Sequence, residues 1–117
     1  MAYLYIFFQS NILEMPAYFL FLKSKRSKWN FFERFIFVTG LNAITHPIVF
    51  FLIMNLRLTY LQNILLAEAF AIFTEAMILK LSLKEKFMPC LFISTFANLL
   101  SWQLAPMFTY LFWPYLK

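Results

Sequence analysis

Long apolar stretches alternate with short polar segments along this chain, and this pattern predicts four helices. The apolar stretches cover residues 3–22, 32–54, 61–81 and 87–112. Each has about the 20 residues that a helix needs to cross the hydrocarbon layer of a membrane. We therefore expect an all-α, polytopic integral membrane protein, in which residues 1–117 form one transmembrane domain, an antiparallel four-helix bundle with short loops.

The composition points to the same class of protein. Apolar residues make up 63% of the chain and charged residues 13%, against about 45–50% and 25% in soluble domains. One cysteine, Cys90, excludes an internal disulfide and any site with several thiolate ligands. We expect the chain to lie in a lipid bilayer, and nothing in the sequence resembles a nucleic-acid reader.

Polar residues interrupt each of the four apolar stretches. Ionisable side chains inside a membrane are costly, and they are tolerated where they are paired or functional. Counting about 1.5 Å of rise per residue, each stretch places one strongly polar group near the middle of the membrane. These groups are Glu14, Asn42, Glu68 and Asn98; His46 follows about one turn nearer to the outer face, Glu75 about two turns nearer to the inner face, and Ser101 shares a helix face with Asn98.

The leading interpretation of this polar site is a small proton- or cation-handling membrane component, active in transport or ion coupling. Glu14 and Glu68 take up a proton or cation in this interpretation, and His46 and Glu75 extend the path toward opposite faces. The reason is chemical, because carboxyl and imidazole groups placed in a membrane span can exchange protons with water. The pattern assigns no catalytic residue, and it favours a protein that is not an enzyme.

A second interpretation makes the same polar residues a glue between helices. Such interhelical hydrogen bonds contribute about 0.6–2 kcal/mol each. The protein is then a non-catalytic accessory or assembly subunit of a larger membrane complex, or it forms a homo-oligomer. This interpretation accounts for a chain that has no extramembrane part of its own.

A third interpretation is a metal-dependent hydrolase that works inside the membrane. Glu14, His46 and Glu68 are the candidate ligands, because imidazole and carboxylate groups suit zinc or non-haem iron. The chain has a single histidine and no HExxH motif. The sequence therefore gives no firm assignment of a cofactor.

The basic residues predict the orientation of the chain. Most of them flank the connection between the first two apolar stretches or between the last two, namely Lys23, Lys25, Arg26, Lys28, Arg34, Lys80, Lys84 and Lys86. Only Arg57 and Lys117 lie elsewhere. Since basic loops stay on the inner side of a membrane, we expect both termini on the outer side of a bacterial or organellar inner membrane.

Overall fold

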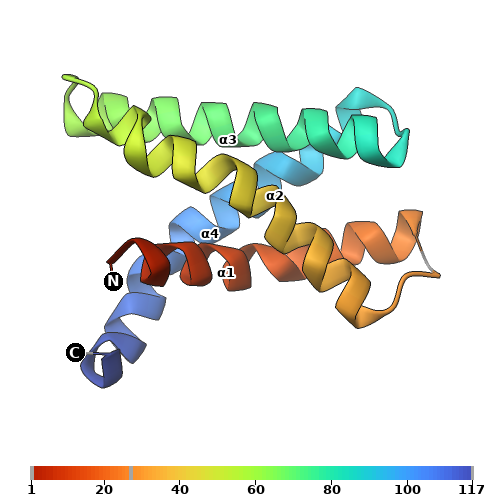
Figure 1. The fold of residues 1–117 in the computed structure, drawn as a ribbon, viewed down its shortest axis with the longest axis horizontal. Helices are drawn as coiled ribbons and strands as arrows, with labels where there is room; N and C mark the ends of the chain where they lie inside the picture. Colours follow the sequence, from red (N-terminus) through yellow and green to blue (C-terminus); the bar gives the residue numbers. More distant parts are fainter. Residues whose placement is uncertain (1, 27, 117) are drawn as a thin grey trace.

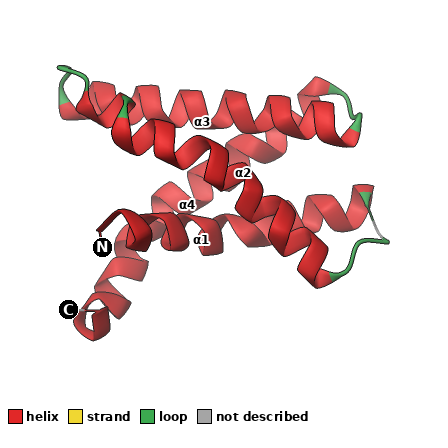
Figure 2. Ribbon diagram, viewed as in Figure 1, coloured by secondary structure: helices red, strands yellow, loops and turns green. Residues whose placement is uncertain are grey.

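A computed structural model describes residues 2–26 and 28–116 and is helical almost throughout (Figure 2). The helices are α1 (Ala2–Lys25), α2 (Phe31–Phe51), a short 3-10 helix η1 (Ile53–Asn55), α3 (Tyr60–Leu83) and α4 (Phe87–Leu116). The described residues contain no strand. The prediction of an all-α fold with four long helices is confirmed. Lys117, which entered the prediction of orientation, lies outside the described residues.

The end of α2 is one place where the predicted stretch runs past the observed helix. The apolar stretch runs to residue 54, whereas α2 ends at Phe51 and the chain tightens into η1. Leu52 closes α2 by donating its backbone N–H to the carbonyl of Ile48. Because the residues beyond Phe51 are still apolar, hydropathy alone does not locate this end.

The connections between helices gather at two ends of the bundle (Figure 1). The α1–α2 and α3–α4 connections lie at one end, which we call the basic end because the basic residues that flank these connections gather there. The α2–α3 connection, the start of α1 and the end of α4 lie toward the opposite end (Figure 1). This is the up-and-down order expected of a four-helix bundle with short connections.

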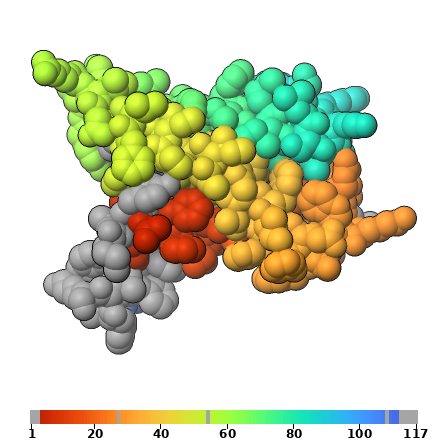
Figure 3. Space-filling view, viewed as in Figure 1, coloured from red at the N-terminus to blue at the C-terminus, as the bar shows by residue number. Residues whose placement is uncertain are grey.

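Two of the helices, α2 and α4, run obliquely across the other two (Figure 1). In Figure 1, α2 passes in front of α1 and α3, and α4 passes behind them along the opposite diagonal. Both α1 and α3 pack against α2 and against α4. Figure 3 shows α2 lying across the front of the molecule, over its centre. The middle of the bundle is therefore lined by all four helices.

Local sequence signals set the helix ends beside the connections. The Asn30 side chain accepts a hydrogen bond of 2.8 Å from the backbone N–H of Glu33 and caps the start of α2. Thr59 and Gln62 form a capping box at the start of α3. Lys84 ends α3 in the left-handed conformation, at φ 54°, and donates its N–H to the Lys80 carbonyl.

The interior divides into an apolar part and a polar part. The apolar part includes Leu22, Val38, Leu79, Leu83 and Cys90, all fully buried or nearly so and all close to the basic end. Buried polar side chains begin at the centre of the bundle and continue toward the opposite end. The apolar part supplies the packing that holds the helices together, and the polar part is where chemistry has to be sought.

Two of the helices are long and apolar enough to cross a membrane, namely α2 over Phe31–Phe51 and α4 over Phe87–Leu111. This finding rests on length and composition. Large apolar side chains also point outward on each helix, and Leu20, Phe31, Leu81 and Phe92 are 69–75% exposed. An apolar exterior of this extent is typical of a surface that contacts lipid or another protein.

Candidate functional site

Ten polar side chains are buried among the described residues, and they come from all four long helices. They are Gln9, Asn11 and Glu14 on α1, Asn42 and Thr45 on α2, Asn63 and Glu75 on α3, and Ser94, Asn98 and Ser101 on α4. Buried polar groups are as a rule hydrogen-bonded. The partners of these groups, and the atoms that have none, define the candidate site.

Glu75 is fully buried on α3 and meets polar groups from the three other long helices. The Tyr18 hydroxyl on α1 donates to Glu75 Oε2 over 3.2 Å. The Asn98 amide on α4 donates to the same oxygen, and it donates its second hydrogen to the Ser94 carbonyl over 2.9 Å. The Thr45 hydroxyl on α2 lies 3.5 Å from Glu75 Oε1. One carboxyl group thus links α3 to every other long helix.

Glu14 is the second carboxyl group of the centre, and its side chain is 1% exposed. Its Oε1 accepts a hydrogen bond of 3.2 Å from the Ser101 hydroxyl. Its Oε2 is buried and has no hydrogen-bond partner among the described residues. The Glu75 and Glu68 carboxyl groups lie close enough to interact with it electrostatically, and the Asn42 side chain lies beside it. Three carboxyl groups therefore share one region of the interior.

Ser101 and Asn98 connect the two buried carboxyl groups. Ser101 Oγ lies 3.2 Å from Glu14 Oε1 and 3.0 Å from the backbone carbonyl of Asn98, whose side chain donates to Glu75. A hydroxyl group has a single hydrogen to donate, so Ser101 satisfies one of its two acceptors at a time. When Glu14 carries a proton, it can donate to Ser101 while Ser101 donates to the Asn98 carbonyl. Both contacts are then hydrogen bonds.

Thr45 repeats this arrangement at Glu75. Its hydroxyl lies 3.2 Å from the Leu41 carbonyl, in its own helix, and 3.5 Å from Glu75 Oε1. A proton on Glu75 Oε1 would let Thr45 accept from Glu75 and donate to Leu41. The surroundings of both carboxyl groups therefore accommodate the protonated form as well as the ionised form.

Two side branches extend the polar network along α1. Asn42 donates to Asn11 Oδ1 over 2.7 Å, and Asn11 donates to Thr39 over 2.9 Å. Further toward the chain termini, Gln9 donates to the Ala105 carbonyl over 2.8 Å and to Thr109 over 2.9 Å. These bonds tie α1 to α2 on one side and to α4 on the other. They fix the position of Glu14 between the two neighbouring helices.

A small cavity of about 50 Å³ adjoins the network. Its lining includes Glu14, Thr45, Asn98 and Ser101 from the network, and it also includes His46 and Glu68. The volume is enough for more than one water molecule or for a small cation. The unpaired oxygen of Glu14 thus belongs to a side chain that borders an internal space.

A larger cavity of about 430 Å³ adjoins the small one, because His46, Glu68 and Ala67 line both. The larger cavity extends to Phe50 and Asn55, beside the α2–α3 connection. His46 is half-buried there and meets the Phe7 ring edge to face, with 5.8 Å between the ring centroids. The Oε2 atom of Glu68 is buried and has no hydrogen-bond partner in the described part of the chain. The space beside Glu14 therefore lies next to one that extends to the α2–α3 connection.

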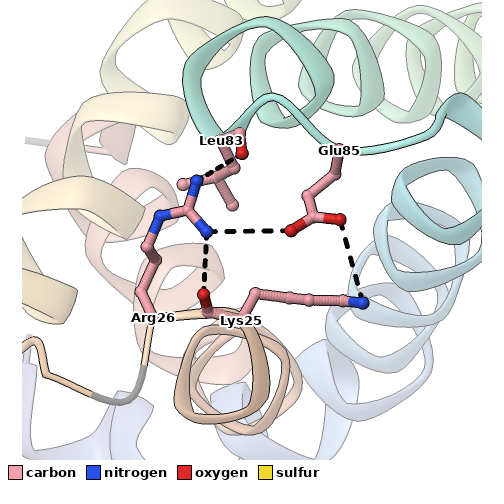
Figure 4. A network of polar contacts seen from close by, with 4 residues as sticks. All are labelled: Lys25, Arg26, Leu83 and Glu85. Atoms are coloured by element: carbon pink, nitrogen blue, oxygen red, sulfur yellow. Dashed lines mark hydrogen bonds and ion pairs between the residues drawn. The ribbon is translucent and has the colours of Figure 1, made fainter.

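The basic end is held together by contacts between its two connections (Figure 4). Arg26 donates a guanidinium N–H to the Leu83 carbonyl, and its other terminal nitrogen lies 3.7 Å from the Glu85 carboxylate. Lys25 lies 3.8 Å from the same carboxylate. These contacts join the end of α1 to the connection that follows α3. Together with the apolar core beneath them, they separate the polar site from this end.

The predicted metal ligands do not have the arrangement of a metal centre. Within residues 2–26 and 28–116, no group of three or more His, Cys, Asp or Glu side chains is placed to hold a metal ion. Glu14, His46 and Glu68 line the same small cavity, but they do not converge on one point. The arrangement gives no support to the metal-dependent hydrolase.

The structure groups the predicted residues differently from the depths in the membrane that were estimated from the sequence. Glu14, His46, Glu68, Asn98 and Ser101 all line the small cavity. Glu75, predicted two turns nearer to the inner face than Glu68, instead bonds to Asn98 at the centre. Asn42 donates to Asn11 and also lies beside Glu14. The cause is the crossing of the helices, because equal distances along crossing helices do not lead to the same point (Figure 1).

Sequence reasoning missed several members of the network. Tyr18, Thr45 and Asn11 are fully buried or nearly so and bond to the site. Tyr18 lies four residues after Glu14, and Thr45 lies three residues after Asn42, so each shares a helix face with a predicted residue. The same periodicity that grouped Asn98 with Ser101 could therefore have found both.

Comparison with protein-family models, with curated proteins and with solved structures gives no match to this chain.

Proposed function

We propose that this protein spans a membrane with all four long helices and handles protons or small cations at the buried carboxyl groups, as a transport or ion-coupling component. Its termini face the outer side of a bacterial or organellar inner membrane, and its basic end faces the inner side. Glu14 is the central acceptor, and Glu68, His46, Glu75, Asn42, Asn98 and Ser101 complete the site.

The membrane part of the proposal is supported by where the polar residues of α1 and α3 point. These two helices fall short of the hydropathy of a span partly because of Asn11, Glu14 and Glu75. All three side chains are buried inside the bundle. Apolar residues such as Phe8 on α1 and Phe73 on α3, 55% and 57% exposed, form the exterior. A bundle with a polar interior and an apolar exterior suits a lipid environment.

A single observation carries the proposed function, namely the unpaired Oε2 atom of Glu14 beside an internal cavity. A buried carboxyl oxygen without a partner is costly unless it binds a proton or a cation. The adjoining cavities lie between this group and the end of the bundle near the α2–α3 connection, which is the route that we propose for the proton. Glu68 and His46 border that route, and both can carry a proton along it.

The contacts from Glu14 through Ser101 and Asn98 to Glu75 place both carboxyl groups in one network. Since a backbone carbonyl and an amide do not pass a proton on, these contacts couple the protonation of Glu14 to that of Glu75 and do not carry a proton between them. Glu75 then forms the innermost group, held by Tyr18, Thr45 and Asn98. The apolar core and the Arg26–Glu85 contacts lie between this group and the basic end. In the proposal the site is therefore reached from the opposite end, and a transporter that works by alternating access needs a state of this kind.

A second candidate function is supported by the same Glu75 bonds. A carboxyl group that joins three neighbouring helices is an effective interhelical glue, and the protein would then be an accessory or assembly subunit of a larger membrane complex. This alternative explains Glu75. It leaves the unpaired oxygens of Glu14 and Glu68 without a role.

Proton flux into sealed vesicles tests the proposal. The full chain is reconstituted into lipid vesicles that enclose a pH-sensitive dye, and a potassium gradient with valinomycin sets the membrane potential. We expect proton uptake by the wild type, its loss in Glu14→Gln, and normal uptake in Glu33→Gln, since Glu33 is an exposed carboxylate outside the site. Uptake by the wild type no faster than that of protein-free vesicles, or equal uptake by Glu14→Gln, would contradict the proposal and favour the assembly subunit.

A further inference from the structure

The larger cavity has the character of a small-molecule site. Its volume is about 430 Å³, and pockets that bind small organic ligands measure about 300–1,000 Å³. Ile6, Val49, Phe50, Ile64 and Ala67 form apolar walls. Such walls bind an apolar group by removing it from water. A cavity reserved for water or a bare ion has no need of them.

Glu68 gives this apolar cavity a carboxyl group. Its Oε2 atom has no solvent exposure of note and no hydrogen-bond partner among the described residues. A wholly apolar ligand would leave this oxygen unpaired and further from water, which costs free energy. A ligand that carries an N–H donor removes this cost, and a positively charged donor bonds more strongly than a neutral one.

The other polar groups of the cavity suit the same ligand. Ser10, His46 and Asn55 lie in the lining with Glu68. A neutral imidazole can accept a hydrogen bond, as can a serine hydroxyl or the oxygen of an asparagine side chain. No lysine or arginine is found in the described lining. The cavity therefore offers acceptors and a carboxylate to its ligand, and it offers no fixed positive charge.

We propose that the larger cavity binds a small hydrophobic amine, with its ammonium group paired to Glu68 and its apolar groups against Val49, Phe50 and Ile64. The ion pair forms in either of two balanced ways. An ammonium ion can bind to ionised Glu68, or a neutral amine can take the proton of protonated Glu68. Binding of this kind needs no movement of protons between Glu14 and Glu75. It goes beyond the proposed function, and it stands or falls by a separate measurement.

A matched pair of probes tests the charge requirement. Dibenzylamine and dibenzyl ether have nearly the same size and shape, and they differ in an NH group replaced by oxygen. The full chain is placed in lipid nanodiscs, and equilibrium dialysis against empty nanodiscs corrects for partition into lipid. We expect saturable binding of dibenzylamine, with an affinity at least about tenfold above that for dibenzyl ether.

Variants of the lining locate the binding. Glu68→Gln is expected to weaken dibenzylamine binding by about tenfold or more, and Glu68→Asp to retain part of the affinity. Ala67→Leu keeps Glu68 but fills part of the cavity, and we expect it to weaken binding of the amine too. Glu33→Gln is the matched control and should bind as the wild type does, since Glu33 lies on the surface at the start of α2.

Several results would overturn the proposal. Absence of saturable amine binding by the wild type is one, and equal affinity for the amine and the ether is another. Unchanged binding by Glu68→Gln, in protein that elutes as a single folded species, would also exclude the ion pair. Proton flux without amine binding would contradict this inference alone, and amine binding without proton flux would contradict the proposed function alone.

Discussion

Tyr18 on α1 donates its hydroxyl hydrogen to Glu75 Oε2 on α3 over 3.2 Å, and both side chains are fully buried in the interior. Tyr18 lies one helical turn after Glu14. This bond therefore connects the two helices that carry the glutamates of the site. It also belongs to the bonds by which Glu75 holds the helices together.

Tyr18→Phe removes one hydrogen bond and little else, because the aromatic ring stays in the apolar core. We expect the free energy of unfolding to fall by about 1 kcal/mol, while proton uptake in vesicles is retained. Thermal unfolding of the detergent-purified variant checks the first point. A variant as stable as the wild type would show that the bond contributes nothing to the fold.

Glu75 should respond differently to Gln and to Ala. Glu75→Gln keeps an acceptor for Tyr18 and Asn98 and adds a donor toward Thr45, so we expect a loss of stability below about 1 kcal/mol. Glu75→Ala leaves three polar partners unsatisfied and opens a space, so we expect a loss of about 3 kcal/mol or more. Unfolding curves for both variants give the comparison. Equal losses would show that the carboxyl group is not the link between the helices.

Ser101→Ala removes the hydroxyl group between Glu14 and the Asn98 carbonyl. We expect proton uptake to fall severalfold, with a loss of stability of about 1 kcal/mol. Ser101→Thr keeps a hydroxyl group and serves as the control, with uptake nearer to that of the wild type. Uptake by Ser101→Ala equal to that of Ser101→Thr would show that the hydrogen bond from this hydroxyl to Glu14 does not affect proton uptake.

The contacts at the basic end should depend mainly on Arg26. Glu85→Gln weakens ion pairs that are partly exposed, and we expect a change below about 1 kcal/mol. Arg26→Ala also removes the donor to the Leu83 carbonyl, and we expect a larger loss of about 1–2 kcal/mol. Thermal unfolding in low and high salt separates the two. If high salt removes most of the stability difference between Arg26→Ala and the wild type, ion pairs and not the bond to the Leu83 carbonyl dominate at this end.

The proposed orientation predicts which cysteine variants react from which side. Lys28→Cys, at the basic end, should react with a membrane-impermeant maleimide from the inner side only, and Arg57→Cys from the outer side only. Both positions are exposed, whereas the natural Cys90 is fully buried and gives a low background. Reaction of both variants from the same side would contradict the four-span arrangement.

The helical fold could be predicted from the sequence, because apolar stretches of about 20 residues alternate with short segments that hold cap residues such as Asn30 and Thr59. The clustering of Glu14, Glu68 and Asn98 could be predicted from helical periodicity. The place of Glu75 could not be predicted, since it depends on the angles at which the helices cross. The sequence also contains no direct sign of the larger cavity, because a cavity arises from the space between side chains.

Infrared spectroscopy can observe the proposed event itself, namely the uptake and release of a proton by Glu14 inside the bundle. Spectra of the wild type in lipid, recorded as differences between two pH values, are compared with those of Glu14→Gln and of Glu33→Gln. The account predicts a band of a protonated, buried carboxyl group that changes with pH in the wild type and in Glu33→Gln and is missing in Glu14→Gln. Identical difference spectra in the wild type and Glu14→Gln would contradict it.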